Sequence, residues 1–215
     1  MLWRWVRVCP QCQRRRAEQR EAEETAKETR RRREMLKACG VSERVGKGFD
    51  DLLEVGDQRA RDAARSLLRR EAYGLYLWGP TGCGKTAPLE ALVTSWIMTT
   101  GRGAVFLRLG EIKRAMVGDF NARDRFIRRL EQAPLLVIDN LEGVKFGQGG
   151  EGLVQELIMG RYARRGPGCV TAFSSIFPPS RQARDLGRPA LESRWMSWGP
   201  VVGMKGIDLR GVLDG

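Results

Sequence analysis

The stretch Leu75–Thr86, with the sequence LYLWGPTGCGKT, decides the fold of this chain. It begins with a short apolar run and continues as Gly-x-x-x-x-Gly-Lys-Thr, the spacing of a phosphate-binding loop between a strand and a helix. Glycine readily adopts the backbone angles that turn loop N–H groups toward an anion, and the following helix points further N–H groups the same way. The pattern predicts a nucleoside triphosphate site formed by Gly79, Pro80, Thr81, Gly82, Cys83, Gly84, Lys85 and Thr86.

Two side chains of this loop and one distant acid carry the expected chemistry. Lys85 reaches the β- and γ-phosphates, and the Thr86 hydroxyl is offered to Mg²⁺. The apolar run Pro134–Asp139 ends in a carboxylate. An Asp at the carboxyl end of a buried parallel strand is the Walker B position of P-loop NTPases, which holds the Mg²⁺ shell. We therefore expect ATP as the cofactor, with Mg²⁺ held through the nucleotide by Thr86 and Asp139.

The composition favours an anionic partner. The chain has 215 residues, a net charge of +12 and a pI near 10.2. Nucleic acid is the commonest physical reason for such an excess, although acidic proteins and anionic membranes attract it as well. The longest apolar runs, about five residues, are too short to span a membrane, and the start lacks the apolar core of a signal peptide. We expect a cytoplasmic chain with no membrane partner, and the absence of histidine excludes catalysis or metal binding by that residue.

The first forty residues differ from the rest of the chain. Cys9-Pro-Gln-Cys12 is half of a zinc site, and no histidine can complete it. Either another chain supplies the remaining zinc ligands or the two thiols are free. From Gln13 to Lys37 the sequence is rich in Arg, Glu, Ala and Lys, which predicts a helix without an apolar face. Such a helix is either a solvated arm or a segment that binds a partner, for which the arginines at 30–33 favour a phosphate or an acidic surface.

Strands and helices alternate after residue 49, which predicts a three-layer α/β sandwich with a parallel sheet. The domain organisation is then an N-terminal extension over 1–40, a linker over 41–48 and an ATP-binding domain over 49–215. The expected strands are 75–78, 104–109, 134–139, 170–174 and 200–204. The expected helices are 58–71, 85–98, 111–117, 123–132, 152–164 and 191–198, with prolines and glycines interrupting the chain between 178 and 189.

The ordered set of motifs resembles the AAA+ helicase loaders and transposition-helper ATPases, the DnaC-like and IstB-like family. The set comprises the P-loop, the Walker B strand, a strand ending in small polar residues, and Leu186-Gly187 followed by Glu192-Ser193-Arg194. The resemblance extends over residues 49–210 and leaves no room for a C-terminal helical lid domain. The Cys pair, the charged helix and the linker Gly40–Arg44 also resemble the leaders of phage-type loaders. Family members use such extensions to bind the replicative helicase, so the resemblance implies that residues 1–40 do so here.

The resemblance also implies roles for three further residues. Ser175 falls where the family's sensor-1 residue follows the fourth strand. Arg194 matches the arginine finger, which reaches the γ-phosphate in a neighbouring subunit and implies a homo-oligomer. Arg210 matches the sensor-2 arginine, which reads the γ-phosphate in its own subunit. The alternative for each arginine is a surface residue of a very basic chain.

Two positions depart from the family pattern, and both affect hydrolysis more than binding: Ser175 replaces a longer amide, and the second departure follows the Walker B acid. The residue after the Walker B acid is normally Glu or Asp, the carboxylate that activates the attacking water, and here it is Asn140. An amide can orient water but cannot accept its proton. We therefore expect a protein that binds ATP and hydrolyses it slowly. Glu142 is the nearest alternative carboxylate, two residues further along.

Three functions follow from these features. The first is an ATP-dependent loader that assembles or remodels a replicative DNA helicase on single-stranded DNA during DNA replication, with arginines holding the phosphates. The second is an IstB-like transposition helper that polymerises on duplex DNA. The third is a non-catalytic, ATP-gated helicase adaptor or inhibitor. Phe120 and Phe126, which alternate with arginines, would stack on bases or belong to the core.

Overall fold

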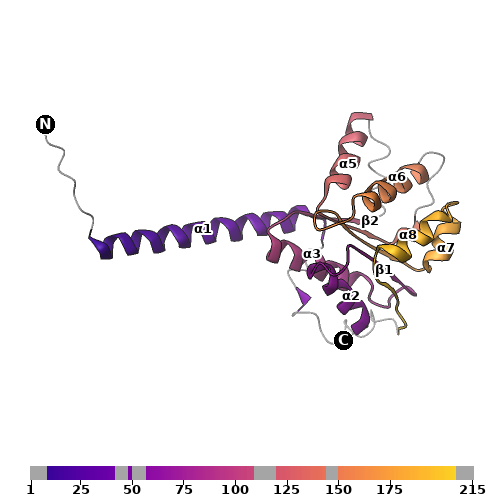
Figure 1. The fold of residues 1–215 in the computed structure, drawn as a ribbon, viewed down its shortest axis with the longest axis horizontal. Helices are drawn as coiled ribbons and strands as arrows, with labels where there is room; N and C mark the ends of the chain where they lie inside the picture. Colours follow the sequence, from indigo (N-terminus) through magenta and orange to yellow (C-terminus); the bar gives the residue numbers. More distant parts are fainter. Residues whose placement is uncertain (1–8, 42–47, 50–56, 109–119, 144–149, 207–215) are drawn as a thin grey trace.

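A computed structural model of the chain describes residues 9–41, 48–49, 57–108, 120–143 and 150–206 (Figure 1). Within these ranges no helix combines the length and the apolar character needed to cross a membrane. The helices are α1 Pro10–Ala38, α2 Gln58–Leu68, α3 Thr86–Thr100, α5 Phe120–Gln132, α6 Gly150–Ala163, α7 Pro179–Asp185 and α8 Ala190–Trp198, with a 3₁₀ turn η2 at Leu141–Gly143. The strands are β1 Gly74–Trp78, β2 Ala104–Arg108, β3 Leu135–Asp139, β4 Val170–Ser175 and β5 Val201–Gly203.

The strands form one sheet in the order β2-β3-β4-β1-β5, and every neighbouring pair is parallel. The predicted parallel sheet is therefore confirmed. Because all strands point the same way, their carboxyl ends lie at one edge of the sheet. The P-loop follows β1 at this edge, Asp139 ends β3 there, and Ser175 ends β4 there.

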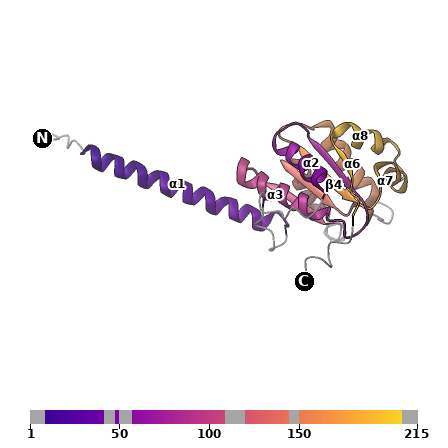
Figure 2. The ribbon, with the colours of Figure 1, turned by 90° about the horizontal axis from the view of Figure 1, so that it is seen from below.

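Two apolar clusters cover the two faces of the sheet and make three layers. Side chains alternate along each strand, as β-geometry requires: Leu75 and Leu77 of β1 join one cluster, and Tyr76 joins the other. The first cluster contains residues of α2 and α3, and the second contains residues of α5, α6, α7 and α8. Figures 1 and 2 show these two groups of helices on opposite sides of the sheet.

The elements agree with the sequence prediction apart from two regions. The segment after Pro178 was expected to be irregular, but Pro179 opens the helix α7. Proline is favoured at the first helical position, since the N–H it lacks has no partner there and its φ angle is already helical. The helix expected at 111–117 lies outside the described residues.

The N-terminal helix α1 projects from the domain as a long arm (Figure 1). Residues 9–27 are all exposed, which agrees with the absence of an apolar face. The C-terminal end of the extension reaches the core, because Cys39 is buried in the first cluster and Leu36 packs against it. The Cys39 carbonyl accepts a hydrogen bond of 2.6 Å from the Phe106 amide of the edge strand β2. The arm is therefore anchored to the sheet at one end.

A buried arginine connects several elements on the face of the sheet that the second cluster covers. Arg161 of α6 has no exposed surface, and burial lowers its pKa to about 10. Its Nε donates to Thr171 Oγ1 at 2.9 Å, and its Nη2 donates to the Val170 carbonyl at 2.7 Å. Its Nη1 donates to the carbonyls of Leu130 and Ala133 at 2.7 and 2.9 Å. One side chain thus ties α6 to the end of α5, the start of β3 and the start of β4.

Candidate nucleotide-binding site

The P-loop has the backbone conformation that its glycines predict. Gly79, Gly82 and Gly84 have φ angles of 153°, 84° and 86°, all in the region that favours glycine. A Cβ on Gly79 would also collide with the Met204 carbonyl oxygen. The first turn of α3 follows at Thr86, so its unpaired N–H groups adjoin the loop. Loop and helix start together form a site suited to an anion.

Lys85 is held inside the loop. Its side chain is only 6% exposed, and its ammonium donates hydrogen bonds of 2.8 Å to the carbonyls of Gly79 and Pro80. A buried ammonium needs such partners because leaving it unpaired costs several kcal/mol. Phosphate oxygens in the loop would offer the same ammonium charge-assisted bonds in place of these carbonyls.

Asp139 lies beside the loop and is connected to it directly. Its carboxylate is buried and accepts hydrogen bonds from Thr86 Oγ1 at 3.1 Å and from the Ser174 hydroxyl. The structure therefore brings Thr86 and Asp139 together, as predicted for the magnesium ligands. A hydroxyl and a carboxylate are the hard oxygen ligands that Mg²⁺ prefers, and Mg²⁺ in nucleotide sites takes one or two carboxylates plus substrate phosphates. These two residues fit that requirement.

Ser174, which the sequence analysis missed, contacts the Walker B acid in place of Ser175. The Ser174 hydroxyl donates to Asp139 and accepts a 3.0 Å bond from the Asn140 amide. The Ser175 hydroxyl instead donates to Gln182 Oε1 at 2.9 Å. Neighbouring residues of a strand face opposite sides of the sheet, so only one of the two serines can reach Asp139. Ser174 shares its side of β4 with Ala172, which lies in the same core cluster as residues of α3.

Asn140 and Glu142, the two candidates for interacting with the attacking water, have different surroundings. Asn140 is exposed and has a φ angle of 62°, a left-handed conformation that Asn and Asp tolerate better than most residues. Glu142 accepts a hydrogen bond of 3.1 Å from the Ile176 amide, so its carboxylate already caps the end of β4. Glu142 is therefore engaged in a structural hydrogen bond, whereas Asn140 follows the Walker B acid directly in the chain.

Of the two predicted arginines, the structure describes Arg194, whose side chain contacts α6 and its own helix. Arg194 lies on α8, where its Nη1 donates to the Ala190 carbonyl at 2.7 Å and its guanidinium is 6.0 Å from the Tyr162 ring centroid. The helix α8 packs on the face of the sheet opposite to α3. The role of Arg194 as an arginine finger in trans stays a prediction. Arg210 lies outside the described residues.

Within the part of the chain that the structure describes, the N-terminal cysteine pair does not form a complete zinc site. Cys9 and Cys12 are both exposed, and the described residues contain no group of three or more Cys, His, Asp or Glu side chains that could hold a metal ion. Zinc in proteins takes four ligands in structural sites. The pKa of the Cys9 thiol lies below its usual range because the backbone N–H groups of Cys12 and Gln11, at the start of α1, donate to it.

The chain has a three-layer fold with a parallel sheet and a P-loop, and it shares this fold with the AAA+ domains of solved replication proteins. Among solved structures, the DnaC helicase loader has 20% identity and a TM-score of 0.62, with 76% of this chain and 100% of that chain covered. DnaI has 18% identity and a TM-score of 0.60, with 83% and 93% covered. The replication initiator DnaA, bound to AMPPCP and single-stranded DNA, has 16% identity and a TM-score of 0.64, with 78% and 52% covered.

These comparisons have clear limits in sequence. The chain spans about half the length of that DnaA structure. No family model matches the sequence, and a comparison with curated proteins finds no match. At these identities the likeness establishes the fold, so the fold expected from the resemblance to DnaC-like ATPases is confirmed.

Proposed function

We propose that the chain is an ATP-binding AAA+ helicase loader, which assembles or remodels a ring-shaped replicative helicase on single-stranded DNA during DNA replication. The observation that carries the proposal is the connected cluster of Lys85, Thr86, Asp139 and Ser174 at the carboxyl edge of the sheet. The fold shared with the DnaC helicase loader and DnaI supports the replication role. The arm α1 supplies the partner-binding segment.

ATP binding uses residues that the cluster already holds in place. Lys85 exchanges the carbonyls of Gly79 and Pro80 for phosphate oxygens. Thr86 and Asp139 would supply oxygen ligands to Mg²⁺, and the bound ion would neutralise phosphate charge. Ser174 holds the Asp139 carboxylate in position by its hydrogen bond. The sensor-1 role of Ser175, whose hydroxyl bonds to Gln182, stays a prediction.

Replacement of Asn140 by aspartate is expected to raise the ATP turnover rate at least about tenfold, since a general base contributes 10²–10⁴-fold in favourable geometry. Asp tolerates the left-handed backbone of this position as Asn does, so the change adds a proton acceptor without strain. The measurement is steady-state phosphate release by the native chain, Asn140→Asp and Asn140→Gly. Glycine serves as the control, because it keeps the backbone and adds no carboxylate. Brisk native hydrolysis that Asn140→Asp leaves unimproved contradicts the slow-hydrolysis proposal.

Subunits would assemble side by side with Arg194 of one chain completing the site of the next. Arg194 of α8 is half-buried beside the ring of Tyr162 on α6. The helix α8 packs on the face of the sheet opposite to α3, the helix that follows Lys85. Arg210 would read the γ-phosphate within its own subunit. Both roles rest on the resemblance in sequence.

Single-stranded DNA would bind through arginines of the domain surface. A groove between the end of α1, the edge strand β2 and α5 is lined by Arg125, Arg128 and Arg129. All three are exposed, whereas Phe126 of the same helix packs against the second core cluster. Phosphate contacts of the arginines, and not base stacking by Phe126, are therefore expected to supply the affinity, which falls as salt concentration rises.

The deciding experiment is a pull-down of the host replicative helicase by the full chain, with and without ATP. We expect ATP-dependent capture, and loss of capture when residues 1–27, which include the exposed residues 9–27 of the arm, are removed. Filaments on duplex DNA without any helicase would favour the transposition helper instead. Tight helicase capture together with undetectable turnover in both the native chain and Asn140→Asp would favour the non-catalytic adaptor.

A further inference from the structure

Gln182 of α7 is a buried polar side chain at the carboxyl edge of the sheet, and it lies outside the sequence motifs described above. It is only 2% exposed. Its Oε1 accepts a hydrogen bond of 2.9 Å from the Ser175 hydroxyl, and its Nε2 donates one of 3.2 Å to the Leu141 carbonyl. A carbonyl can only accept, so Leu141 fixes which end of the amide faces it. Both ends of the amide are therefore used.

The two partners of Gln182 belong to different parts of the candidate site. Ser175 ends β4, and its carbonyl accepts a hydrogen bond of 3.1 Å from the amide of Gly79, the first glycine of the P-loop. Leu141 begins the turn η2 and directly follows Asn140. Gln182 therefore bridges the strand that contacts the P-loop and the turn that follows the Walker B acid.

The turn that Gln182 holds has an unusual backbone. Asn140 has a φ angle of 62°, and it is exposed although Asp139 before it and Leu141 after it are buried. A non-glycine residue in this conformation persists where its surroundings determine it, and such residues gather at functional sites. Two hydrogen bonds determine it here, because the Asn140 amide donates to the Ser174 hydroxyl at 3.0 Å and the next carbonyl accepts from Gln182. The exposed residue thus sits in a turn that is held on both sides.

Packing alone does not require an amide at position 182. Ala183 and Leu186, its neighbours in the chain, lie in the second apolar cluster, as does Leu141. Replacing hydrogen-bonded partners in a core by apolar groups of the same shape can be nearly neutral for stability. A buried amide that joins two parts of a site therefore points to a role beyond packing.

We propose that Gln182 is a positioning residue for ATP hydrolysis, which holds the turn so that the side chain at position 140 meets the attacking water. The inference rests on the proposed ATP site and gives Gln182 a role in turnover but none in ATP binding. Its hydrogen bonds go to Ser175 and Leu141, whereas Lys85 and Thr86, the expected ligands of phosphate and Mg²⁺, bond to other groups. Removal of the amide should therefore lower the turnover rate and leave the affinity for ATP unchanged.

A double-mutant cycle in the full-length chain tests the proposal. Gln182→Met keeps the length of the side chain and removes both hydrogen bonds. It is combined with Asn140→Asp, which supplies a carboxylate, and separately with Asn140→Gly, which leaves no side chain to position. Single-turnover hydrolysis of radiolabelled ATP measures the rate, and titration with a fluorescent ATP analogue measures the affinity.

The two backgrounds should respond differently. With Asn140→Asp, we expect Gln182→Met to lower the hydrolysis rate at least about tenfold, since a misplacement of about 1 Å can cost about 10²-fold. The affinity for the analogue should stay within about twofold, as for a residue that acts only after binding. With Asn140→Gly, the rate should change by less than about twofold, because a residue that acts through position 140 has no effect once that side chain is gone. A purely structural role would lower both rates by the same factor.

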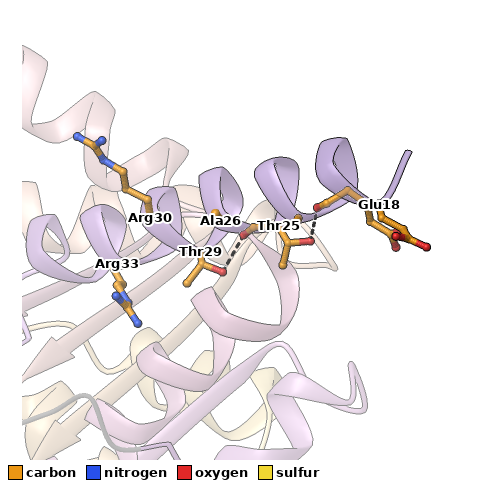
Figure 3. A pocket seen from close by; sticks show the side chains of 8 residues that line it. Glu18, Thr25, Ala26, Thr29, Arg30 and Arg33 are labelled. Carbon is orange, nitrogen blue, oxygen red and sulfur yellow. Dashed lines mark hydrogen bonds between the residues drawn. The ribbon is translucent and has the colours of Figure 1, made fainter. Parts of the chain in front are cut away.

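Two controls separate positioning from stability in the Asn140→Asp background. Arg161→Met removes buried hydrogen bonds at the starts of β3 and β4. Thr29→Val removes the 2.8 Å hydrogen bond from the Thr29 hydroxyl to the Thr25 carbonyl in the arm (Figure 3). Both should hydrolyse ATP at the rate of Asn140→Asp at a temperature below their thermal transitions. A loss of rate in Arg161→Met as large as in Gln182→Met would overturn the proposal.

The remaining outcomes also decide. The proposal is overturned if Gln182→Met changes the rate equally in both backgrounds or in neither, or if Asn140→Asp binds ATP without measurable turnover. Absence of ATP binding by the native chain would overturn the proposed function together with this inference, so the two failures are distinguishable. If Gln182→Met lacks a cooperative thermal transition, Gln182→Glu takes its place in the cycle. It keeps the shape and an acceptor for Ser175, and it loses the amide donor to Leu141.

Discussion

Replacement of Lys85 by alanine is expected to weaken ATP binding by about a hundredfold or more. The ammonium is positioned within the loop by the carbonyls of Gly79 and Pro80, at 2.8 Å each, and can redirect the same donors to phosphate oxygens. Hydrogen bonds to charged groups contribute about 1.5–3 kcal/mol each. Loss of two such bonds therefore corresponds to about 3 kcal/mol, or somewhat more than a hundredfold in the dissociation constant. Equilibrium titration with a fluorescent ATP analogue measures the change.

The control for this experiment is Lys37→Ala, which removes the same charge from the exposed surface of α1. It should bind the analogue with native affinity, and both variants should retain a cooperative thermal transition. ATP affinity that is unchanged in a folded Lys85→Ala protein would remove the basis of the proposed function.

Replacement of Arg161 by methionine is expected to lower the free energy of unfolding by about 3 kcal/mol or more. Methionine keeps most of the side-chain volume but donates no hydrogen bond. The carbonyls of Leu130, Ala133 and Val170 would then stay buried without this partner. Each buried polar group left unsatisfied costs about 1–3 kcal/mol. Relief of the desolvation cost, which lowers the pKa of Arg161 to about 10, offsets part of that loss. Urea denaturation followed by tryptophan fluorescence gives the difference.

Arg165→Met provides the comparison, because Arg165 is exposed and is close in sequence. Its effect should stay within about 0.5 kcal/mol, as for most surface substitutions. Equal free energies of unfolding of the two variants would show that the buried hydrogen bonds of Arg161 do not stabilise the fold.

The order of strands and helices was predictable from sequence because local signals agree with the tertiary structure. The apolar runs at β1, β3 and β4 are buried along their length, and the glycine spacing after β1 fixes the P-loop. The helix α7 was missed because Pro178-Pro179 reads as an interruption. The second proline is instead the first residue of the helix.

The contacts that complete the site depend on tertiary geometry that no local pattern contains. Choosing Ser174 over Ser175 requires knowing which side of β4 faces Asp139, which depends on the strand order. The burial of Cys39 likewise depends on the edge of β2 lying next to the end of α1. Arg161 gives no sign of burial in sequence, since its role comes from carbonyls of three other segments.

The helix α3 lies between the candidate nucleotide site and the anchored C-terminal end of α1. Its first residue, Thr86, bonds to Asp139, and the Met98 carbonyl near its other end accepts a hydrogen bond from Arg32 of α1. It has 15 residues, so it spans about 22 Å at 1.5 Å per residue. The same helix therefore contacts both the nucleotide site and the arm. If nucleotide changes the affinity of the arm for a partner, thermodynamic linkage requires that partner to change the affinity for nucleotide by the same factor.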